Sequence, residues 1–110
     1  MLVLFTGALG EGVAAKDAVL AFIRVVGVGG SAGYAIEYGG PGIAGLGIEA
    51  RMTLCNMAVE AGSRVAMVAP DDQTFAFLEG KPYAPQAAAF ERALDHWRSL
   101  LSDADAKFDR

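Results

Sequence analysis

The chain has 110 residues, of which 54% are hydrophobic and 20% are charged, and its formal net charge is −4. This length fits a single domain over residues 1–110, because globular chains divide into units of roughly 100–150 residues. Nine basic residues against 13 acidic ones have the wrong sign for binding a nucleic-acid backbone. The one cysteine, Cys55, excludes an internal disulfide and a Cys-x-x-Cys metal site.

No apolar run in the sequence is long enough to cross a membrane. The longest, residues 18–23, stops at Arg24, far short of the roughly 20 residues that a spanning helix needs. The apolar residues 2–5 lack a basic flank and are too few for the core of a signal peptide. We therefore expect a soluble, cytoplasmic protein that binds neither membranes nor nucleic acid.

The first half of the chain is predicted to contain a strand, a helix and a second strand. Residues 2–5 have the pattern of a short buried strand, and the glycines of residues 7–12 indicate a turn. A helix is predicted over about residues 14–26, because apolar residues recur at helical spacing until Gly27 interrupts them. Residues 34–38 are the second strand candidate.

The middle of the chain is predicted to form a helix, a strand and a short helix. The first helix spans residues 48–61 and ends at the glycine that follows, and residues 63–68 form the third strand. Either Asp71 or Asp72 caps the short helix that continues through residues 74–78.

The last part of the sequence predicts a stiff, extended connection at residues 80–85 and then the clearest helix, over residues 86–101. Residues 102–110 turn polar and indicate a boundary. Because strands alternate with helices, we expect an α/β fold with a mainly parallel sheet. The last helix is expected to carry four large apolar side chains on one face: Phe90, Leu94, Trp97 and Leu101.

The glycine-rich residues 27–33 invite comparison with a nucleotide-binding loop. A phosphate cradle places its glycines between a strand and the start of a helix, where free amides point at the anion. Here the glycines follow a predicted helix and precede a predicted strand, and their spacing differs from G-x-G-x-x-G. Tight turns are therefore the favoured interpretation.

Two single residues have reactive side chains but little context for chemistry. His96 is the only histidine and has no second metal ligand or nucleophile near it in the sequence, so a surface or interface position is favoured. Cys55 lies inside a predicted apolar helix, where a buried structural thiol is more common than a nucleophile.

Asn56 and Glu60 are polar residues one turn apart on a helix that is otherwise largely apolar. Such a pair is compatible with a stripe exposed to water and also with two side chains that point into a polar site. Spacing alone does not decide between the two.

Several segments together resemble the aconitase family, in particular its members that isomerise 2-isopropylmalate to 3-isopropylmalate. The most specific of them is Met-Thr-Leu-Cys-Asn-Met at residues 52–57, within the similar stretch 49–62. Residues 33–38, 68–75 and 80–85 continue the resemblance, which covers nearly the whole chain.

The resemblance implies a three-layer α/β/α domain from a larger hydro-lyase of leucine biosynthesis. In that family a [4Fe-4S] cluster is held by three cysteines in motifs that this sequence lacks, so no cluster is expected on this chain alone. Asn56 and Glu60 match family positions near the cluster. There the asparagine is implied to hydrogen-bond close to the cluster, and the glutamate to bind the water or hydroxyl that moves.

The resemblance also implies partners. The substrate would be a hydroxy-dicarboxylate, and the substrate arginines, a base serine, the remaining domains and a small subunit would lie outside this chain. Other hydroxy-polycarboxylates, such as citrate or homocitrate, remain open as substrates. A different class of function, a non-catalytic domain that self-associates, is favoured by the high apolar fraction.

Overall fold

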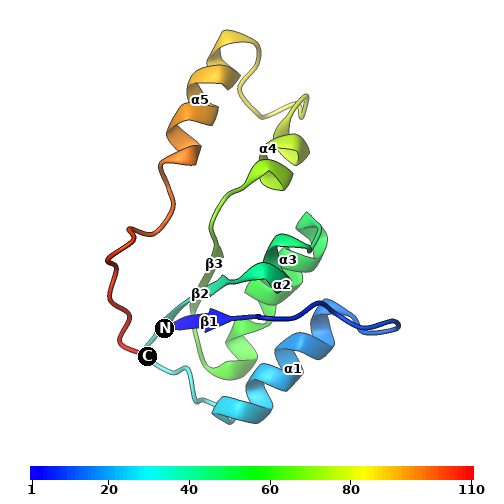
Figure 1. The fold of residues 1–110 in the computed structure, drawn as a ribbon, viewed down its shortest axis with the longest axis vertical. Helices are drawn as coiled ribbons and strands as arrows, with labels where there is room; N and C mark the ends of the chain where they lie inside the picture. Colours follow the sequence, from blue (N-terminus) through cyan, green and yellow to red (C-terminus); the bar gives the residue numbers. More distant parts are fainter. The chain divides into compact units, whose positions relative to one another are not determined.

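The computed structural model describes residues 1–110 and contains a three-stranded parallel sheet in the order β1–β2–β3 (Figure 1). The strands are β1 (Leu2–Leu4), β2 (Ala35–Gly39) and β3 (Val65–Val68). In the register of the sheet, Tyr38 of β2 lies opposite both Val3 of β1 and Val68 of β3. The α/β class, the parallel sheet and all three predicted strands are confirmed.

The chain contacts divide the molecule into two compact units. The first consists of Met1–Val68 together with Lys107–Arg110, and the second of Ala69–Ala106. That the whole chain is one domain stays a prediction. No helix in either unit combines the length and the apolar character that crossing a membrane requires.

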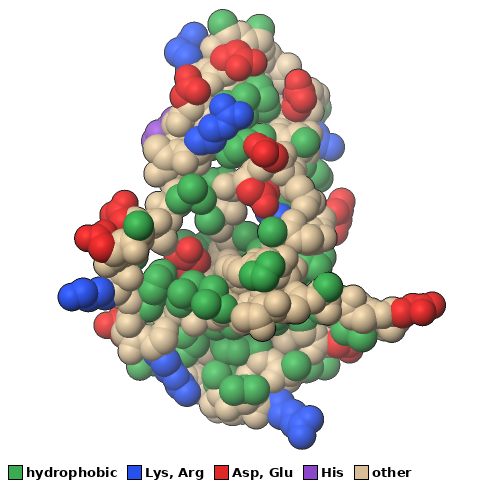
Figure 2. Space-filling view, in the orientation of Figure 1, with side chains coloured by type: hydrophobic (Ala, Val, Ile, Leu, Met, Phe, Trp, Pro, Cys, Tyr) green, Lys and Arg blue, Asp and Glu red, His purple; other side chains and the backbone are tan.

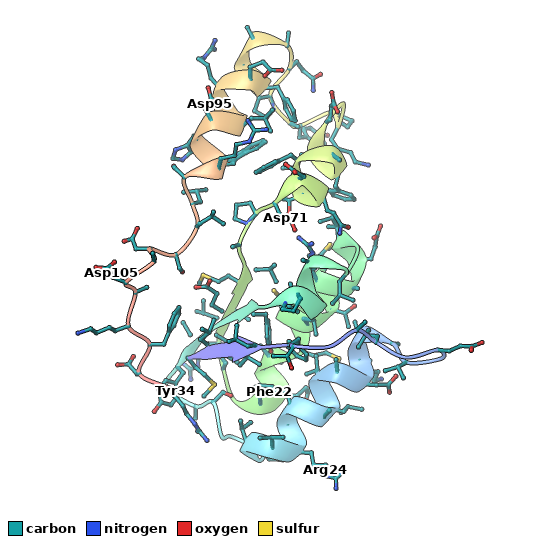
Figure 3. All side chains as sticks on the ribbon, viewed as in Figure 1. Phe22, Arg24, Tyr34, Asp71, Asp95 and Asp105 are labelled. Carbon is teal, nitrogen blue, oxygen red and sulfur yellow. The ribbon has the colours of Figure 1, made fainter.

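Helix α1 (Ala15–Val26) follows the first strand and agrees with the predicted helix. It begins where the Asp17 carboxylate accepts a hydrogen bond of 2.9 Å from the Ala14 amide, and it ends at Gly27, whose φ is +84°. Its apolar side turns toward the sheet with Phe22, whereas Arg24 projects away from it (Figure 3). The spacing of apolar residues therefore predicted both the helix and its buried face.

The segment between β2 and β3 is more divided than the sequence indicated. A short helix α2 (Pro41–Ala44) was not predicted, because four residues are too few for a periodic pattern. The helix predicted over residues 48–61 is wrong in its second part. It consists of α3 (Ile48–Asn56) followed by a 3₁₀ helix, η1 (Met57–Ala61).

The two faces of the sheet differ in their surroundings. Alternate side chains point to opposite faces of a strand. One face joins the hydrophobic core through Val3, Ile36, Tyr38, Ala66 and Val68. Helix α1 packs against both α3 and η1, so these elements lie together over that face. The opposite face carries Leu4, Val65 and Met67, each about half exposed to solvent.

The second unit contains α4 (Asp72–Leu78) and α5 (Ala88–Arg98). Of the two candidate caps, Asp71 is the one that caps α4, since its carboxylate accepts from the Thr74 amide at 3.2 Å. The segment predicted as an extended connection instead folds into turns, and the Ala84 amide donates to the Lys81 carbonyl at 3.1 Å.

Helix α5 is shorter than predicted at both ends and buries fewer of the expected side chains. Phe90 is buried, and Trp97 packs edge-on against it with ring centroids 5.7 Å apart. Trp97 also stacks on Phe75 of α4 at 6.1 Å. Leu101 was wrongly placed on this face, because α5 ends at Arg98 and Leu101 is exposed. This small aromatic cluster is the core of the second unit.

Candidate functional site

The predicted site residues lie on the outer face of the segment formed by α3 and η1, which we define as Met52, Asn56, Val59 and Glu60. Asn56 is the last residue of α3, and Glu60 lies within η1. Both polar residues are exposed, as are Met52 (54%) and Val59 (63%) beside them. The asparagine and the glutamate therefore share an accessible surface with two apolar side chains.

The inner face of the same segment consists of Arg51, Leu54, Ala58 and Ala61, all of which are buried. Leu54 and Ala61 are completely inaccessible to solvent, and the helices of this face pack against α1. The hydrophobic core thus fixes the orientation of the segment. It turns the outer face, with Asn56 and Glu60, away from the core.

The 3₁₀ turn changes how Asn56 and Glu60 are aligned. A continuous α-helix would rotate Glu60 by roughly 40° from Asn56, whereas 3₁₀ geometry rotates it by roughly 120° and eclipses Asn56 with Val59. The separation along the helix axis also grows, from about 6 Å to about 8 Å. The straight stripe expected from i, i+4 spacing is therefore twisted, so a ligand bound by both side chains would have to bridge a wider gap.

Gly62 ends η1 and links it to the glycine-rich loop. Its φ is +93°, a left-handed conformation, and a Cβ placed on it would lie 2.8 Å from the Cα of Gly29. The Ser31 amide donates to the Ala61 carbonyl at 2.9 Å. The glycines of this loop thus permit a close backbone approach at the end of η1, which agrees with the turn interpretation.

Arg51 is a residue of this segment that the sequence analysis missed. Its side chain is only 4% exposed. Its Nε donates to the Leu46 carbonyl at 2.9 Å, and a terminal guanidinium nitrogen donates to the Ala44 carbonyl at 3.3 Å. Arg51 thereby holds the end of α2 against the start of α3. Its position three residues before Leu54, on the buried side of the helix, was a signal that could have indicated this role.

Three other reactive side chains lie apart from the outer face. Cys55 is half-buried, and burial raises the pKa of its thiol, which disfavours the thiolate that nucleophilic attack or metal binding requires. His96 is exposed on α5, in agreement with the predicted surface position. Tyr38 is 1% exposed, and its hydroxyl has no hydrogen-bond partner. Burial, and secondarily Cys55, raises the pKa of Tyr38 to about 12.

The residues of this chain do not form the ligand set of an iron–sulfur cluster. Cluster irons are held by thiolates, usually three or four of them, and this chain has one thiol, which burial keeps protonated. No group of three or more His, Cys, Asp or Glu side chains is arranged to hold a metal ion. We therefore derive no chemical step on this chain through a bound metal.

The polar side chains of the outer face are available to hydrogen-bond a ligand. Neither the Asn56 amide nor the Glu60 carboxylate is engaged by another side chain of this chain. An ionised carboxylate accepts hydrogen bonds from water or a hydroxyl, and an amide both donates and accepts. Two such groups on one rigid segment can bind and orient a hydroxyl-bearing ligand.

Comparison with known proteins places these residues in context. The sequence profile described as "Aconitase family (aconitate hydratase)" matches residues 1–110. The "3-isopropylmalate dehydratase large subunit" of Sorangium cellulosum is 55% identical over 103 residues, which are 94% of this chain and 22% of that protein. The "3-isopropylmalate dehydratase large subunit 1" of Bradyrhizobium diazoefficiens is 51% identical over 110 residues, 100% of this chain and 23% of that protein. The chain thus spans less than a quarter of the length of these relatives.

Proposed function

The chain belongs to the aconitase family, and on that premise we propose that residues 1–110 form one part of a larger hydro-lyase. The reaction is the isomerisation of 2-isopropylmalate to 3-isopropylmalate in leucine biosynthesis. The observation that carries this proposal is the similarity along the whole chain to two bacterial 3-isopropylmalate dehydratase large subunits.

The proposed reaction removes a water molecule from the substrate and adds it back at the neighbouring carbon. The hydroxyl leaves one carbon with a proton from the next, and water returns with the two positions exchanged. A protein group must hold the leaving hydroxyl or the returning water throughout. We assign this role to the Glu60 carboxylate, and we assign to the Asn56 amide a hydrogen bond to another part of the bound ligand. The exposure of both side chains on one core-anchored segment supports this assignment.

The remaining catalytic groups are assigned to other parts of the longer protein. The aconitase family uses a [4Fe-4S] cluster, whose ligands this chain lacks, so they would lie outside residues 1–110. The arginines that bind the substrate carboxylates, a base serine and a small subunit would be contributed in the same way. The role of this chain is then to present Asn56 and Glu60 to a site completed by other segments.

A substrate panel tests the proposal. The longer protein, assayed together with its small subunit, is expected to convert 2-isopropylmalate in preference to citrate and homocitrate. Turnover of citrate or homocitrate alone would replace the proposed substrate with another hydroxy-polycarboxylate. An Asn56→Ala variant is expected to lose about 10-fold to 100-fold in turnover, because one hydrogen bond in the transition state is removed. Absence of turnover with every one of these acids would contradict the proposed reaction.

A second candidate function, a non-catalytic self-associating domain, is favoured by large apolar side chains on the surface (Figure 2). Exposed apolar patches commonly mark contacts with another protein. Light scattering of the 110-residue chain over a range of concentrations tests this alternative. A mass that rises to that of a dimer, together with a longer protein that lacks hydro-lyase activity, would support it over the enzyme.

A further inference from the structure

β1 lies at the edge of the sheet and pairs with β2 on one side only. Two of the bonds to β2 fix which groups face it: the Met1 carbonyl accepts from the Glu37 amide at 2.9 Å, and the Phe5 amide donates to the Gly39 carbonyl at 2.9 Å. Backbone groups of successive residues in a strand point to opposite sides. The amides of Leu2 and Leu4 therefore point to the outer edge of β1, away from β2.

The first position of that outer edge is already paired with the end of the chain. The Leu2 amide donates to the Arg110 carbonyl at 2.8 Å. The Arg110 guanidinium in turn donates to the Gly30 carbonyl at 2.9 Å. These two bonds hold Arg110 beside the start of β1, where Figure 1 places the two chain termini side by side.

An apolar groove of about 480 Å³ runs from the same edge of β1 to α1. Its lining includes Leu4, which is 58% exposed, and Val25, which is 83% exposed. The one acidic side chain in the lining, Asp17, already accepts a hydrogen bond from the Ala14 amide. Parallel strands are normally buried on both faces, and an exposed apolar edge is prone to unwanted pairing. The edge offers unpaired backbone groups and the groove offers an apolar surface, which together could accept another strand.

We propose that the segment following Arg110 in the longer protein adds a fourth, parallel strand to the outer edge of β1 and fills this groove with its apolar side chains. The inference rests on the proposed function only in requiring that residues 1–110 belong to a longer chain.

The register of the proposed strand follows from the hydrogen bond between the Leu2 amide and the Arg110 carbonyl. In a parallel ladder that starts with the Leu2 amide on the Arg110 carbonyl, the Leu4 amide donates to the carbonyl two residues beyond Arg110. An antiparallel strand with the same first bond would instead place Phe108 opposite Leu4, and no backbone hydrogen bond joins these two residues. The parallel direction is therefore the one that carries the following residues along the groove.

A second copy of the chain is the competing occupant, and two observations disfavour it. Arg110 of the same chain already holds the first pairing position at Leu2. The relatives are more than four times as long as this chain, so a continuation would be tethered at the edge. A tethered segment has a high effective concentration and outcompetes a free partner.

Hydrogen exchange tests this inference independently of catalysis. The amide of Leu4 is expected to exchange at least tenfold more slowly in the longer protein than in the 110-residue chain, since only the longer protein supplies its acceptor. The amide of Val28, which is 91% exposed in a loop outside the groove, is the control and is expected to exchange at the same rate in both. Equal exchange at Leu4 in the two proteins would overturn the proposal.

A matched pair of variants tests the groove. In the longer protein, Leu4→Lys is expected to restore fast exchange at the amide of residue 4, whereas Val28→Lys leaves the protection of that amide unchanged. Protection at Leu4 that depends on protein concentration would assign the edge to a second copy and overturn the proposal. A natural gene product that ends at Arg110 would overturn it as well. None of these outcomes depends on which acid the enzyme uses, so the proposed function can fail separately.

Discussion

The inner and outer faces of the α3–η1 segment share one backbone but differ in burial and bonding. Leu54, Ala58 and Ala61 on the inner face are almost completely inaccessible to solvent, whereas Asn56 and Glu60 on the outer face are exposed. The inner face can contribute to stability only, because no ligand can reach it. The outer face contributes little to this unit's stability, so its polar residues are free to serve another purpose. The comparison separates the residues that hold the segment from those available to act.

The largest difference in the loss of stability is expected between substitutions of two apolar residues of α3. Leu54→Ala leaves a cavity in the core and is expected to lower the free energy of unfolding by about 3 kcal/mol. Met52→Ala, on the exposed outer face, is expected to lower it by less than about 1 kcal/mol. Urea denaturation of the 110-residue chain measures both. Equal losses for the two variants would show that the two faces are not distinct.

Arg51 is the polar residue of the buried inner face. Replacing it in Arg51→Met removes the donor that serves the carbonyls of Ala44 and Leu46, which is expected to lower the free energy of unfolding by about 2 kcal/mol. Arg51→Lys retains a charged donor but not the fork of the guanidinium, so we expect it to recover part of the loss. The same denaturation experiment measures these variants. A fully stable Arg51→Met protein would remove Arg51 from the residues that hold α3.

The smallest expected effect at neutral pH concerns Tyr38 in the core beneath this segment. Tyr38→Phe removes a buried hydroxyl that has no partner and is expected to raise the free energy of unfolding by about 1 kcal/mol. Phe at this position retains the ring contacts with Phe5 and Phe22. Thermal unfolding at pH 7 checks the sign, and a destabilised variant would indicate that the hydroxyl has a role in the folded protein.

The pKa of Tyr38 adds a dependence on pH. Burial raises this pKa from 10.0 to about 12, so between these values the unfolded chain loses the proton while the folded chain keeps it. The free energy of unfolding therefore falls as pH rises through this window, by up to about 3 kcal/mol. The raised pKa of Cys55 acts in the same direction, starting from its ordinary value of 9.0. Denaturation from pH 8 to 12 should show a smaller fall in Tyr38→Phe, and an identical fall would contradict this cause.

Periodicity in the sequence was enough to predict the strands and α1, because each has several apolar residues on one face and a glycine or proline near its end. It did not predict α2 or the change from α3 to η1. Those features depend on tertiary contacts, such as the approach of Gly29 to Gly62 and the bonds of Arg51 to two carbonyls. Leu101 was misplaced because an apolar residue in helical register does not itself continue a helix beyond its last turn.

The candidate site was predictable to a lesser degree. Spacing identified Asn56 and Glu60 as a pair but left their environment open, since both a solvated stripe and a polar site fit i, i+4 spacing. The specific motif at residues 52–57 supplied the functional interpretation, and the comparison with relatives supports the family. The structure adds that both side chains are accessible and that a 3₁₀ turn twists one relative to the other. The groups that we propose to complete the site lie outside residues 1–110, so these residues carry no signal for them.

The role proposed for the outer face is tested most directly by measuring both turnover and stability of the Glu60→Gln variant of the longer protein. If the outer face acts on the transferred water, kcat is expected to fall by about 10²–10³, equivalent to roughly 3–4 kcal/mol of transition-state stabilisation. The free energy of unfolding is expected to change by less than about 0.5 kcal/mol, because Glu60 is exposed. Glu49→Gln, at the exposed start of α3 in the same α3–η1 segment, is the matched control and should retain near-native kcat. A Glu60→Gln enzyme with native turnover would contradict the account and return Glu60 to a solvent-exposed stripe.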